Sequence, residues 1–474
     1  MSFKAYLALF LAFLVIQVHA WMPGEHQEIY SVNGNNLFNN SQTDGDSKRW
    51  LPGTPKIRGV NLGSLFVMEP WMASAEWNSM GCGAWPSEFD CVMHLGQGQA
   101  NQAFQNHWNS WITQGDITQM VSYGLNTIRI PLGYWLLETI VYADSEHFPQ
   151  GAFPYLERIV GWASDAGMYI ILDVHGAPGA QQPQQPFTGQ YAPSASFYQG
   201  YQYDRAKEFV GWLSEVVHTR GAFRNVGMIE LVNEPIQNTG ATPGLLDNYY
   251  PNAYAEIRAR EARLGISSNN LLHIQAMVPT SFQFILLTNE NADIFFHRTH
   301  CGALVTHIPT LQMIGSWLTM TTGNSSKTGF ILFTKYSRYI KWDNGVPVDK
   351  GAYIRDACHN NRLSNWPTIV GEFSLSVPDS VQWNGDWHPD GNRAFYTQWF
   401  SAQIIAYERD TNGWIFWSWK TQLGDYRWGY QGKYPADIYF VPLYFGTNFM
   451  ADAVAQGVIP NNPQNINWGT CNGV

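Results

Sequence analysis

The sequence predicts an α/β fold of the (β/α)8 barrel type, the TIM barrel, built as a single catalytic domain. Strand-like runs of continuous apolar residues alternate with amphipathic helical stretches along most of the 474 residues, which is typical of a parallel sheet buried on both faces. About eight such runs fit a closed barrel better than an open, doubly wound sheet. Polar residues follow several of these runs, and a barrel of this type carries its active site there.

The predicted elements alternate in a regular order. Strands are expected at residues 57–63, 126–133, 168–176, 227–235, 270–277, 367–376 and 413–420. Helices are expected at 101–123, 153–167, 203–220, 252–265 and 392–410. Each expected helix has apolar residues at helical spacing, whereas the strands are short and rich in Val, Ile and aromatic residues.

The alternation fails between residues 278 and 337, where no clean amphipathic period appears. One interpretation is a long irregular loop, although compact domains seldom contain one of this length. The other is that this stretch is not native coding sequence but a gene-model error such as a mis-spliced intron or a frameshift. We therefore predict one catalytic domain over residues 21–474, with 278–337 irregular.

The composition excludes several classes of protein. A net charge of −10 argues against nucleic-acid binding, which needs a basic surface. Neither a phosphate-binding glycine loop nor a CxxC or HExxH metal pattern is present, so we expect no metal and no cofactor. The 21 Trp and 24 Tyr exceed what a core needs, and exposed aromatic rings are platforms for flat apolar faces such as those of sugars.

The first 20 residues read as a secretory signal peptide. One lysine precedes an apolar run that is too short to span a membrane, and a small residue ends it. No other segment has the length of apolar sequence that a membrane helix needs. We therefore expect a secreted, extracellular monomer, with Asn39 and Asn324 in N-x-S glycosylation sequons.

Five cysteines fit an oxidising compartment, where disulfides persist. Cys82 and Cys91 are close enough to close a small loop, and Cys358 with Cys471 would tie a late loop to the C-terminus. Cys301 is left without a partner in this arrangement.

Two carboxylates follow strands that would lie in one barrel. Glu234 comes after Asn233 at the end of one strand, and Glu372 ends another. Two carboxylates at one barrel mouth are what cleavage of a glycosidic bond needs, since one must donate a proton while the other attacks the anomeric carbon. A single glutamate at a strand end is more often a helix cap or a surface residue. Asn233 would hold the sugar 2-hydroxyl, a contact that strengthens in the transition state.

Other polar and aromatic residues fall at equivalent positions. Arg129, His175 and the Trp417–Trp419 pair are each expected at the C-terminal end of a strand. Alone, such an arginine is more often a structural ion-pair residue, and a tryptophan is more often part of the core. Their joint occurrence with the two glutamates predicts a site.

The motifs NTIRIPLGYW, DVHGAPGAQ, LVNEP, GEFS and GWIFWSWK together resemble glycoside hydrolase family 5, a family of retaining enzymes in clan A. The fungal exo-β-1,3-glucanase and endo-β-1,6-glucanase branches are the most similar. The resemblance covers residues 55–275 and 338–430 and is specific as a combination. It implies Glu234 as the acid/base, Glu372 as the nucleophile and Arg129 as the residue that holds the nucleophile's carboxylate.

The resemblance also implies residues that line the substrate site. His175 and Asn233 would line the subsite at the cleavage point, and Trp417 would be the sugar-stacking tryptophan, with Trp419 as an alternative. The family usually has a His-x-Tyr pattern on its sixth strand. In YSRYIKW, residues 336–342, Tyr339 matches the tyrosine but Ser337 replaces the histidine, which puts full activity in doubt.

The stretch at residues 58–72, the Cys82–Cys91 loop and the stretch GEFSLSVPDSVQWNGDW are more similar to the endo-β-1,6 branch. The sequence therefore predicts a secreted retaining endo-β-1,6-glucanase that acts on β-glucan polysaccharide. An exo-β-1,3-glucanase and a catalytically impaired glucan-binding protein remain the alternatives. Glu69 is as consistent with a sugar contact as with a structural role.

Overall fold

The computed structural model describes residues 56–238, 240–277, 284–288, 294–298, 332–359, 367–430, 453–454, 457–460 and 462–474. The predicted signal peptide, Cys301 and both sequon asparagines, Asn39 and Asn324, lie outside these residues.

Eight strands form a closed parallel barrel, as predicted, in the order β1-β10-β9-β8-β5-β4-β3-β2. The strands are β1 (Ile57–Asn61), β2 (Thr127–Gly133), β3 (Tyr169–Gly176), β4 (Val226–Glu230), β5 (His273–Ala276), β8 (Leu332–Arg338), β9 (Thr368–Phe373) and β10 (Gly413–Phe416). The first strand pairs with both β2 and β10, which closes the barrel. The carboxyl ends of all eight strands therefore meet at one mouth.

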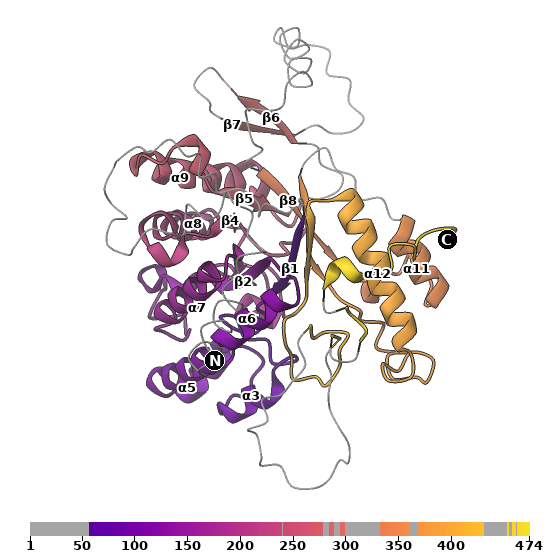
Figure 1. The fold of residues 1–474 in the computed structure, drawn as a ribbon. Coiled ribbons are helices and arrows are strands. Elements are labelled where there is room, and N and C mark those ends of the chain that lie inside the picture. Colours follow the sequence, from indigo (N-terminus) through magenta and orange to yellow (C-terminus); the bar gives the residue numbers. More distant parts are fainter. Residues whose placement is uncertain are drawn as a thin grey trace, which may run out of the picture.

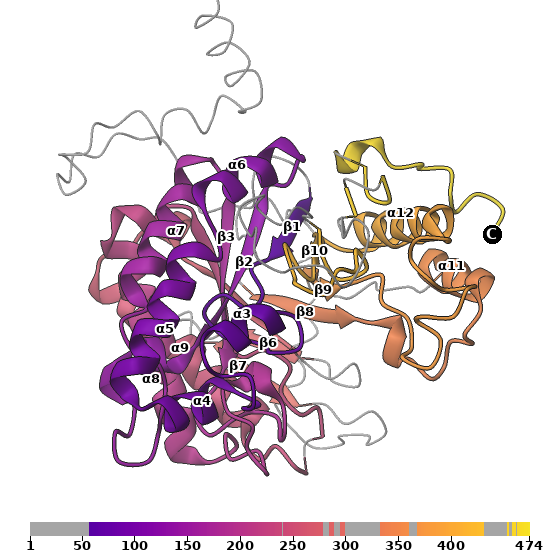
Figure 2. The same cartoon turned by 90° about the horizontal axis from the view of Figure 1, so that it is seen from below.

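Helices surround the barrel (Figures 1 and 2). They are α3 (Ser74–Ser79), α4 (Glu88–Leu95), α5 (Gln97–Ser110), α6 (Gln114–Ser122), α7 (Phe153–Asp165), α8 (Gly200–Thr219), α9 (Tyr250–Arg263), α11 (Lys350–His359) and α12 (Arg393–Asp410). Short 3₁₀ turns lie at residues 134–136, 138–140, 186–188, 221–223, 268–270, 340–342 and 463–465, with a π turn at 245–249. Within the described part of the chain, no helix has the length and apolar character to cross a membrane.

The helix predicted over residues 101–123 is in fact two helices, α5 and α6. Thr113 begins the second one: its hydroxyl oxygen accepts from the Asp116 backbone N–H, and the Asp116 carboxylate accepts from the Thr113 backbone N–H at 2.8 Å. This capping box satisfies backbone donors that the start of a helix leaves unpaired. Both helices have apolar residues at helical spacing, which is why the pattern alone suggested one helix.

The segment predicted to be irregular ends earlier than residue 337. Residues 332–337 belong to β8, which pairs in parallel with β5 and β9 and completes the barrel. Further back in the same segment, β6 (Phe284–Thr288) and β7 (Ile294–Arg298) pair antiparallel and project away from the barrel (Figure 1). Both strands contribute nothing to the barrel sheet, in agreement with the loss of the helix–strand alternation.

The barrel interior is layered. At the amino-terminal end, one cluster of buried side chains fills the floor: Ile57, Tyr169, Ile171, Met228, Phe333, Ile369 and Ile415. Residues two apart on a strand point to the same side, so Asp173 and His175 follow Tyr169 and Ile171 towards the mouth. An apolar floor therefore lies beneath a polar upper layer.

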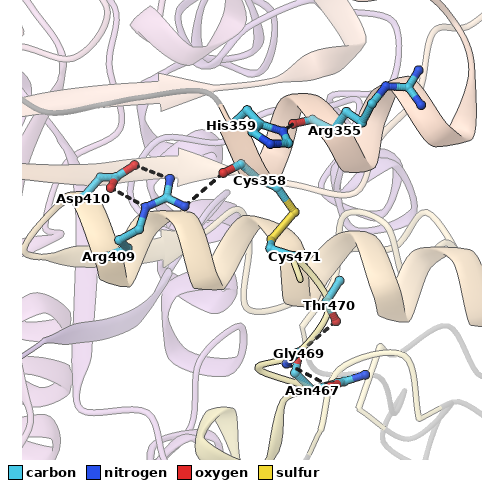
Figure 3. Close-up of a disulfide and its surroundings, with 9 residues drawn as sticks. All are labelled: Arg355, Cys358, His359, Arg409, Asp410, Asn467, Gly469, Thr470 and Cys471. Atoms are coloured by element: carbon cyan, nitrogen blue, oxygen red, sulfur yellow. Dashed lines mark hydrogen bonds and ion pairs between the residues drawn. A yellow bond between two sulfur atoms is a disulfide. The ribbon is translucent and has the colours of Figure 1, made fainter. Parts of the chain in front are cut away.

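Both predicted disulfides are present. Cys82 pairs with Cys91, and Cys358 at the end of α11 pairs with Cys471. Figure 3 shows the second bond beside Arg409, whose guanidinium donates to the Cys358 carbonyl oxygen at 3.0 Å. Because this disulfide links residues 113 positions apart, loop-closure entropy alone predicts a stabilisation of about 4–5 kcal/mol.

Candidate active site

Arg129 organises the buried polar layer below the mouth. It was predicted at the end of its strand, but it is the third residue of β2, so its side chain starts deeper in the barrel. Its guanidinium donates to Glu230 Oε2 at 2.8 Å and to Glu372 Oε1 at 2.9 Å, and it lies 2.8 Å from Asp173 Oδ2. One arginine therefore holds three carboxylates from three strands, β3, β4 and β9.

The carboxylates keep Arg129 charged. Burial works to lower the pKa of its guanidinium, but the charges of Asp173, Glu230 and Glu372 outweigh burial and raise the pKa above its ordinary value. A further contact, from Nη1 to Asn61 Oδ1 at 2.8 Å, joins the arginine to β1. The guanidinium is thus a fixed positive charge, with its donors directed in a rigid fork.

Asn233 lies three residues beyond β4, with its amide oxygen turned towards cations. Its Oδ1 accepts from Arg129 Nη2 at 2.9 Å and also from Lys335 Nζ. Since both partners can only donate, the atom that faces them must be the oxygen. The amide NH₂ group is therefore the end of Asn233 that is free to donate to a bound molecule.

The turn that carries Glu234 is strained and firmly held. Glu234 has a φ of +41°, in the left-handed region that non-glycine residues rarely adopt. Gln181 Nε2 donates to the Asn233 carbonyl at 3.0 Å, and Gln182 Nε2 donates to the Glu234 carbonyl at 2.9 Å. Such a conformation costs of the order of 1–3 kcal/mol and persists only where neighbours fix it. The two glutamines that follow β3 supply this support.

The Glu372 carboxylate lies almost fully buried near the end of β9, between two cations and a phenol. Its Oε1 accepts from Arg129 and from Lys335 Nζ, the latter at 2.7 Å, while its Oε2 accepts from the Tyr339 hydroxyl at 3.0 Å. Burial works to raise the pKa of Glu372, but the charges of Lys335 and Arg129 outweigh it and hold the pKa at about 2. Glu372 is therefore ionised over the whole ordinary pH range.

The pKa of Glu234 is shifted in the opposite direction to that of Glu372. Its side chain is partly exposed at the mouth, yet burial raises the pKa of its carboxyl and the negative charge of Glu372 raises it further. The charges of Lys335 and His175 oppose this rise without reversing it. Two carboxyl groups thus share one site with their pKa values moved apart, the condition that separates an acid from a nucleophile.

His175 and Trp417 lie together at the mouth. Their rings stack with centroids 5.5 Å apart and planes 7° apart. The His175 Nδ1 lies 2.6 Å from Asp173 Oδ2, which fixes the imidazole orientation. Trp419 is instead fully buried away from this cluster, where its indole N–H donates to Asp116 Oδ1 at 2.9 Å. Of the two tryptophans considered from the sequence, Trp417 is the one beside His175.

Ser337 lies where the family pattern has a histidine, in register with Glu372 across β8 and β9. Its hydroxyl is buried, and hydrogen bonding from this side chain is one of the influences that lower the pKa of Glu234. Tyr339, directly after β8, contacts Glu372 as described. Burial and the charge of Glu372 raise the pKa of the Tyr339 phenol, which keeps it a donor.

Sequence reasoning missed part of the polar layer, namely Lys335, Glu230, Asp173 and Asn61. Lys335 is buried, with Nζ 3.3 Å from Glu230 Oε1 in addition to its contact with Glu372. Asp173 and Glu230 had a detectable signal, because each is a charged residue inside an otherwise apolar strand. Lys335 had none, since it falls in the segment without a clear period.

Glu69, left open by the sequence, borders the same mouth. It is buried, and Trp71 Nε1 donates to its Oε2 at 2.8 Å. Burial raises the pKa of Glu69 to about 7, and the charges of Glu372 and Glu234 add to this effect. A third carboxyl group therefore shares the electrostatic field of the site.

In the described residues no group of three or more His, Cys, Asp or Glu side chains gathers as a metal site.

Comparisons with known proteins identify the family of this chain. The family described as Cellulase (glycosyl hydrolase family 5) matches residues 94–276. The chain is 53% identical to glucan endo-1,6-beta-glucosidase B of Emericella nidulans over 94% of this chain and 95% of the relative. It is 50% identical to a probable glucan endo-1,6-beta-glucosidase B of Neosartorya fischeri, over 94% of this chain and 93% of that relative.

Two weaker similarities are to a relative with a different activity name and to a solved structure. A probable glucan 1,3-beta-glucosidase A of Neosartorya fischeri is 27% identical over 82% of this chain and 88% of its own. The crystal structure of a rutinosidase from Aspergillus niger is 18% identical, has a TM-score of 0.53 and covers 81% of this chain and 92% of that chain. The structural likeness supports the barrel fold. By its identity to curated relatives over nearly its whole length, this chain belongs to glycosyl hydrolase family 5 and is a glycoside hydrolase.

Proposed function

We propose that this chain is a secreted, retaining endo-β-1,6-glucanase in which Glu234 is the acid/base and Glu372 is the nucleophile. The linkage and the endo action are inferred from relatives about half identical to this chain, which are named glucan endo-1,6-beta-glucosidases. The substrate is then a neutral β-glucan polysaccharide, which suits a protein of net charge −10.

One observation carries the assignment of roles: the two carboxyl groups have pKa values moved in opposite directions. Arg129 and Lys335 hold the pKa of Glu372 at about 2 against the effect of burial. Burial and the charge of Glu372 raise the pKa of Glu234. At mildly acidic pH, Glu372 is a carboxylate while Glu234 retains a proton to donate, as double displacement requires.

In the first step, a Glu372 carboxylate oxygen attacks the anomeric carbon while the Glu234 carboxyl donates its proton to the departing 6-oxygen of the next sugar. Oε1 of Glu372 already accepts from two cations, whereas Oε2 has only the neutral Tyr339 hydroxyl. Oε2 therefore has the more available electron pair, and we assign it the attack. The Asn233 amide donates to the sugar 2-hydroxyl during this step.

In the second step, Glu234 is a carboxylate and removes a proton from water as the water oxygen attacks the same carbon. The bond from that carbon to Glu372 breaks, and the released sugar keeps its β configuration. Glu372 is an uncharged ester in this step, so it no longer raises the pKa of Glu234, and the lower pKa favours the ionised form that a general base needs.

The proposal is tested by incubating purified protein with a β-1,6-glucan and with a β-1,3-glucan. We expect short oligomers from the β-1,6 polymer, together with loss of this activity in Glu234→Gln and in Glu372→Gln. Glucose alone from the β-1,3 polymer would favour the exo-β-1,3-glucanase instead, which more distant relatives named glucan 1,3-beta-glucosidase A, 27% and 29% identical, support. Binding of both polymers without cleavage would favour an impaired glucan-binding protein, for which Ser337 is the specific observation.

For Glu234→Gln we expect kcat/KM on β-1,6-glucan to fall by about 10²–10⁴-fold, the usual contribution of general acid–base catalysis. We also expect the alkaline limb of the pH profile to disappear. On the alkaline side of the wild-type profile, kcat/KM falls because Glu234 loses its proton as the pH rises through the raised pKa of its carboxyl group. The loss should be smaller on an aryl glucoside whose leaving group needs no proton. Measuring kcat/KM against pH for both substrates checks this.

Glu69 is the matched control, because its pKa is raised to about 7 in the same site. If Glu234 is the acid, Glu69→Gln keeps the alkaline limb. An alkaline limb that vanishes in Glu69→Gln but persists in Glu234→Gln would reverse the assignment.

For Lys335→Met we expect both limbs of the pH profile to move to higher pH. The Lys335 charge lowers the pKa of Glu372 and also opposes the rise in the pKa of Glu234, so both pKa values increase when it is removed. The acid limb follows Glu372 and the alkaline limb follows Glu234. Lys350→Met is the control. Lys350 is the first residue of α11, and its Nζ donates to Asn392 Oδ1 at 2.6 Å. A Lys335→Met profile that coincides with wild type would contradict this role.

Two further proposals concern the primary sequence. Residues 1–20 act as a signal peptide, which amino-terminal sequencing of the exported protein tests. We also propose that part of 278–331 is a gene-model error, supported by the loss of the helix–strand alternation there, whereas β8, from residue 332, completes the barrel. A transcript that encodes the whole segment would overturn this.

A further inference from the structure

Three tryptophans form an aromatic wall on one side of the barrel mouth. Trp342 is 61% exposed, Trp71 is 39% exposed and Trp428 is nearly buried behind them. The rings of Trp71 and Trp428 are 5.1 Å apart, and those of Trp342 and Trp428 are 6.2 Å apart. We refer to Trp71, Trp342 and Trp428 as the tryptophan wall. Single exposed indoles are common, but indoles that form one contiguous exposed surface mark a binding site.

The wall is built from loops next to the nucleophile strand. Trp71 follows β1, Trp342 follows β8 and Trp428 follows β10. In the barrel order β1-β10-β9-β8, these strands lie around β9, which carries Glu372. Three loops far apart in sequence therefore bring their indoles to the same sector of the mouth.

The wall is continuous with the catalytic centre. The Tyr339 ring lies 5.2 Å from Trp342 and 5.8 Å from Trp428. The hydroxyl of the same tyrosine donates to Glu372 Oε2 at 3.0 Å. A molecule whose reacting atom is at Glu372 thus meets the wall in the direction of Tyr339.

Lys341 and Asp379 brace the wall. The Lys341 ammonium lies 5.5 Å from the Trp342 ring centroid and 5.7 Å from the Trp428 centroid, so one cation contacts both rings. It also pairs with Asp379 at 2.6 Å, on the loop after β9. These contacts hold Trp342 in place on one side and leave most of its surface exposed, so little ordering remains to be done when a ligand binds.

We propose that the tryptophan wall is a binding subsite for the glucan chain, at a sugar unit next to the two joined by the bond that is cleaved. The inference rests on the proposed function, since it takes the ligand to be a neutral β-linked glucan. The apolar C–H faces of a pyranose ring stack on an indole, while its hydroxyls remain in water. An endo-acting enzyme needs contacts beyond the cleaved bond, because it must hold the interior of a chain.

The test compares Trp342→Ala with wild type on β-1,6-linked gluco-oligosaccharides of two to six units. We expect the ratio of kcat/KM for the hexamer to that for the dimer to fall about threefold to tenfold, the range expected for one aromatic contact. Titration calorimetry in a Glu372→Gln background should show a matching rise in the Kd of the hexamer. Trp342→Phe should keep most of the affinity, because it keeps a ring.

Trp468→Ala is the matched control, since Trp468 is 47% exposed but belongs to the C-terminal segment that Cys471 ties to α11. It should leave the length dependence and the Kd as in wild type. Trp342→Ala with wild-type Kd and length dependence would overturn the wall as a subsite. If wild type cleaves no β-1,6 oligomer, the proposed function fails, while the titration still decides whether Trp342 binds the sugar.

Discussion

Replacing Glu372 by glutamine is expected to lower kcat on β-1,6-glucan by about 10⁴-fold or more, as for removal of a nucleophile in other enzymes. The amide has nearly the same shape but cannot form the covalent ester on which double displacement depends. The loss should appear in kcat with little change in KM, since the site is otherwise intact. Steady-state kinetics on the purified variant measures it.

Glu88→Gln is a suitable control for this substitution. Glu88 is also a buried glutamate, on α4, and burial raises the pKa of its carboxyl to about 8. It is therefore protonated at neutral pH, and glutamine should replace it with little effect on kcat.

Adding azide to Glu372→Gly should restore turnover and give an α-glycosyl azide, because a small anion then attacks from the vacated position. Rescue in Glu234→Gly that gives this α product would contradict the assignment.

Replacing Arg129 by methionine is expected to lower the free energy of unfolding by about 3–5 kcal/mol and also to abolish activity. The substitution leaves three buried carboxyl groups, Asp173, Glu230 and Glu372, without their shared cation. Removing one partner of a buried ion pair has this magnitude, because a buried charge is left uncompensated. Urea unfolding followed by tryptophan fluorescence measures the change in stability.

Arg263→Met provides the comparison. Arg263 is more than half exposed and lies 3.3 Å from Glu215 on the helix surface. Exposed ion pairs contribute about 0.2–1 kcal/mol, so this variant should unfold close to wild type. Equal stabilities of the two variants would mean that Arg129 does not stabilise the fold by compensating the buried carboxylates of the barrel interior.

The sequence was sufficient for the barrel fold, although β8 lies in the segment predicted to be irregular. Parallel strands are buried on both faces, so they appear as continuous apolar runs, and the polar residues after them must meet at one mouth. This reasoning placed Glu234 and Glu372 at the mouth of one barrel, and in the structure the charge of Glu372 raises the pKa of Glu234. Both disulfides were also predicted correctly.

The depth of side chains in the barrel could not be predicted. The depth at which a side chain starts depends on where its strand begins and ends and on the stagger of neighbouring strands in the barrel. Arg129 was therefore expected at the mouth but starts lower, in the same polar layer as Glu230 and Lys335. Two adjacent candidates of identical type, Trp417 and Trp419, also required the structure to separate them.

The most direct test of the proposed mechanism is to follow the reducing ends released from β-1,6-glucan by proton NMR immediately after enzyme is added. Double displacement at Glu372 predicts that the β-anomer signal appears first and that the α-anomer grows only later, by mutarotation. An α-anomer that appears first would mean a single displacement by water, and Glu372 could not then be the covalent nucleophile.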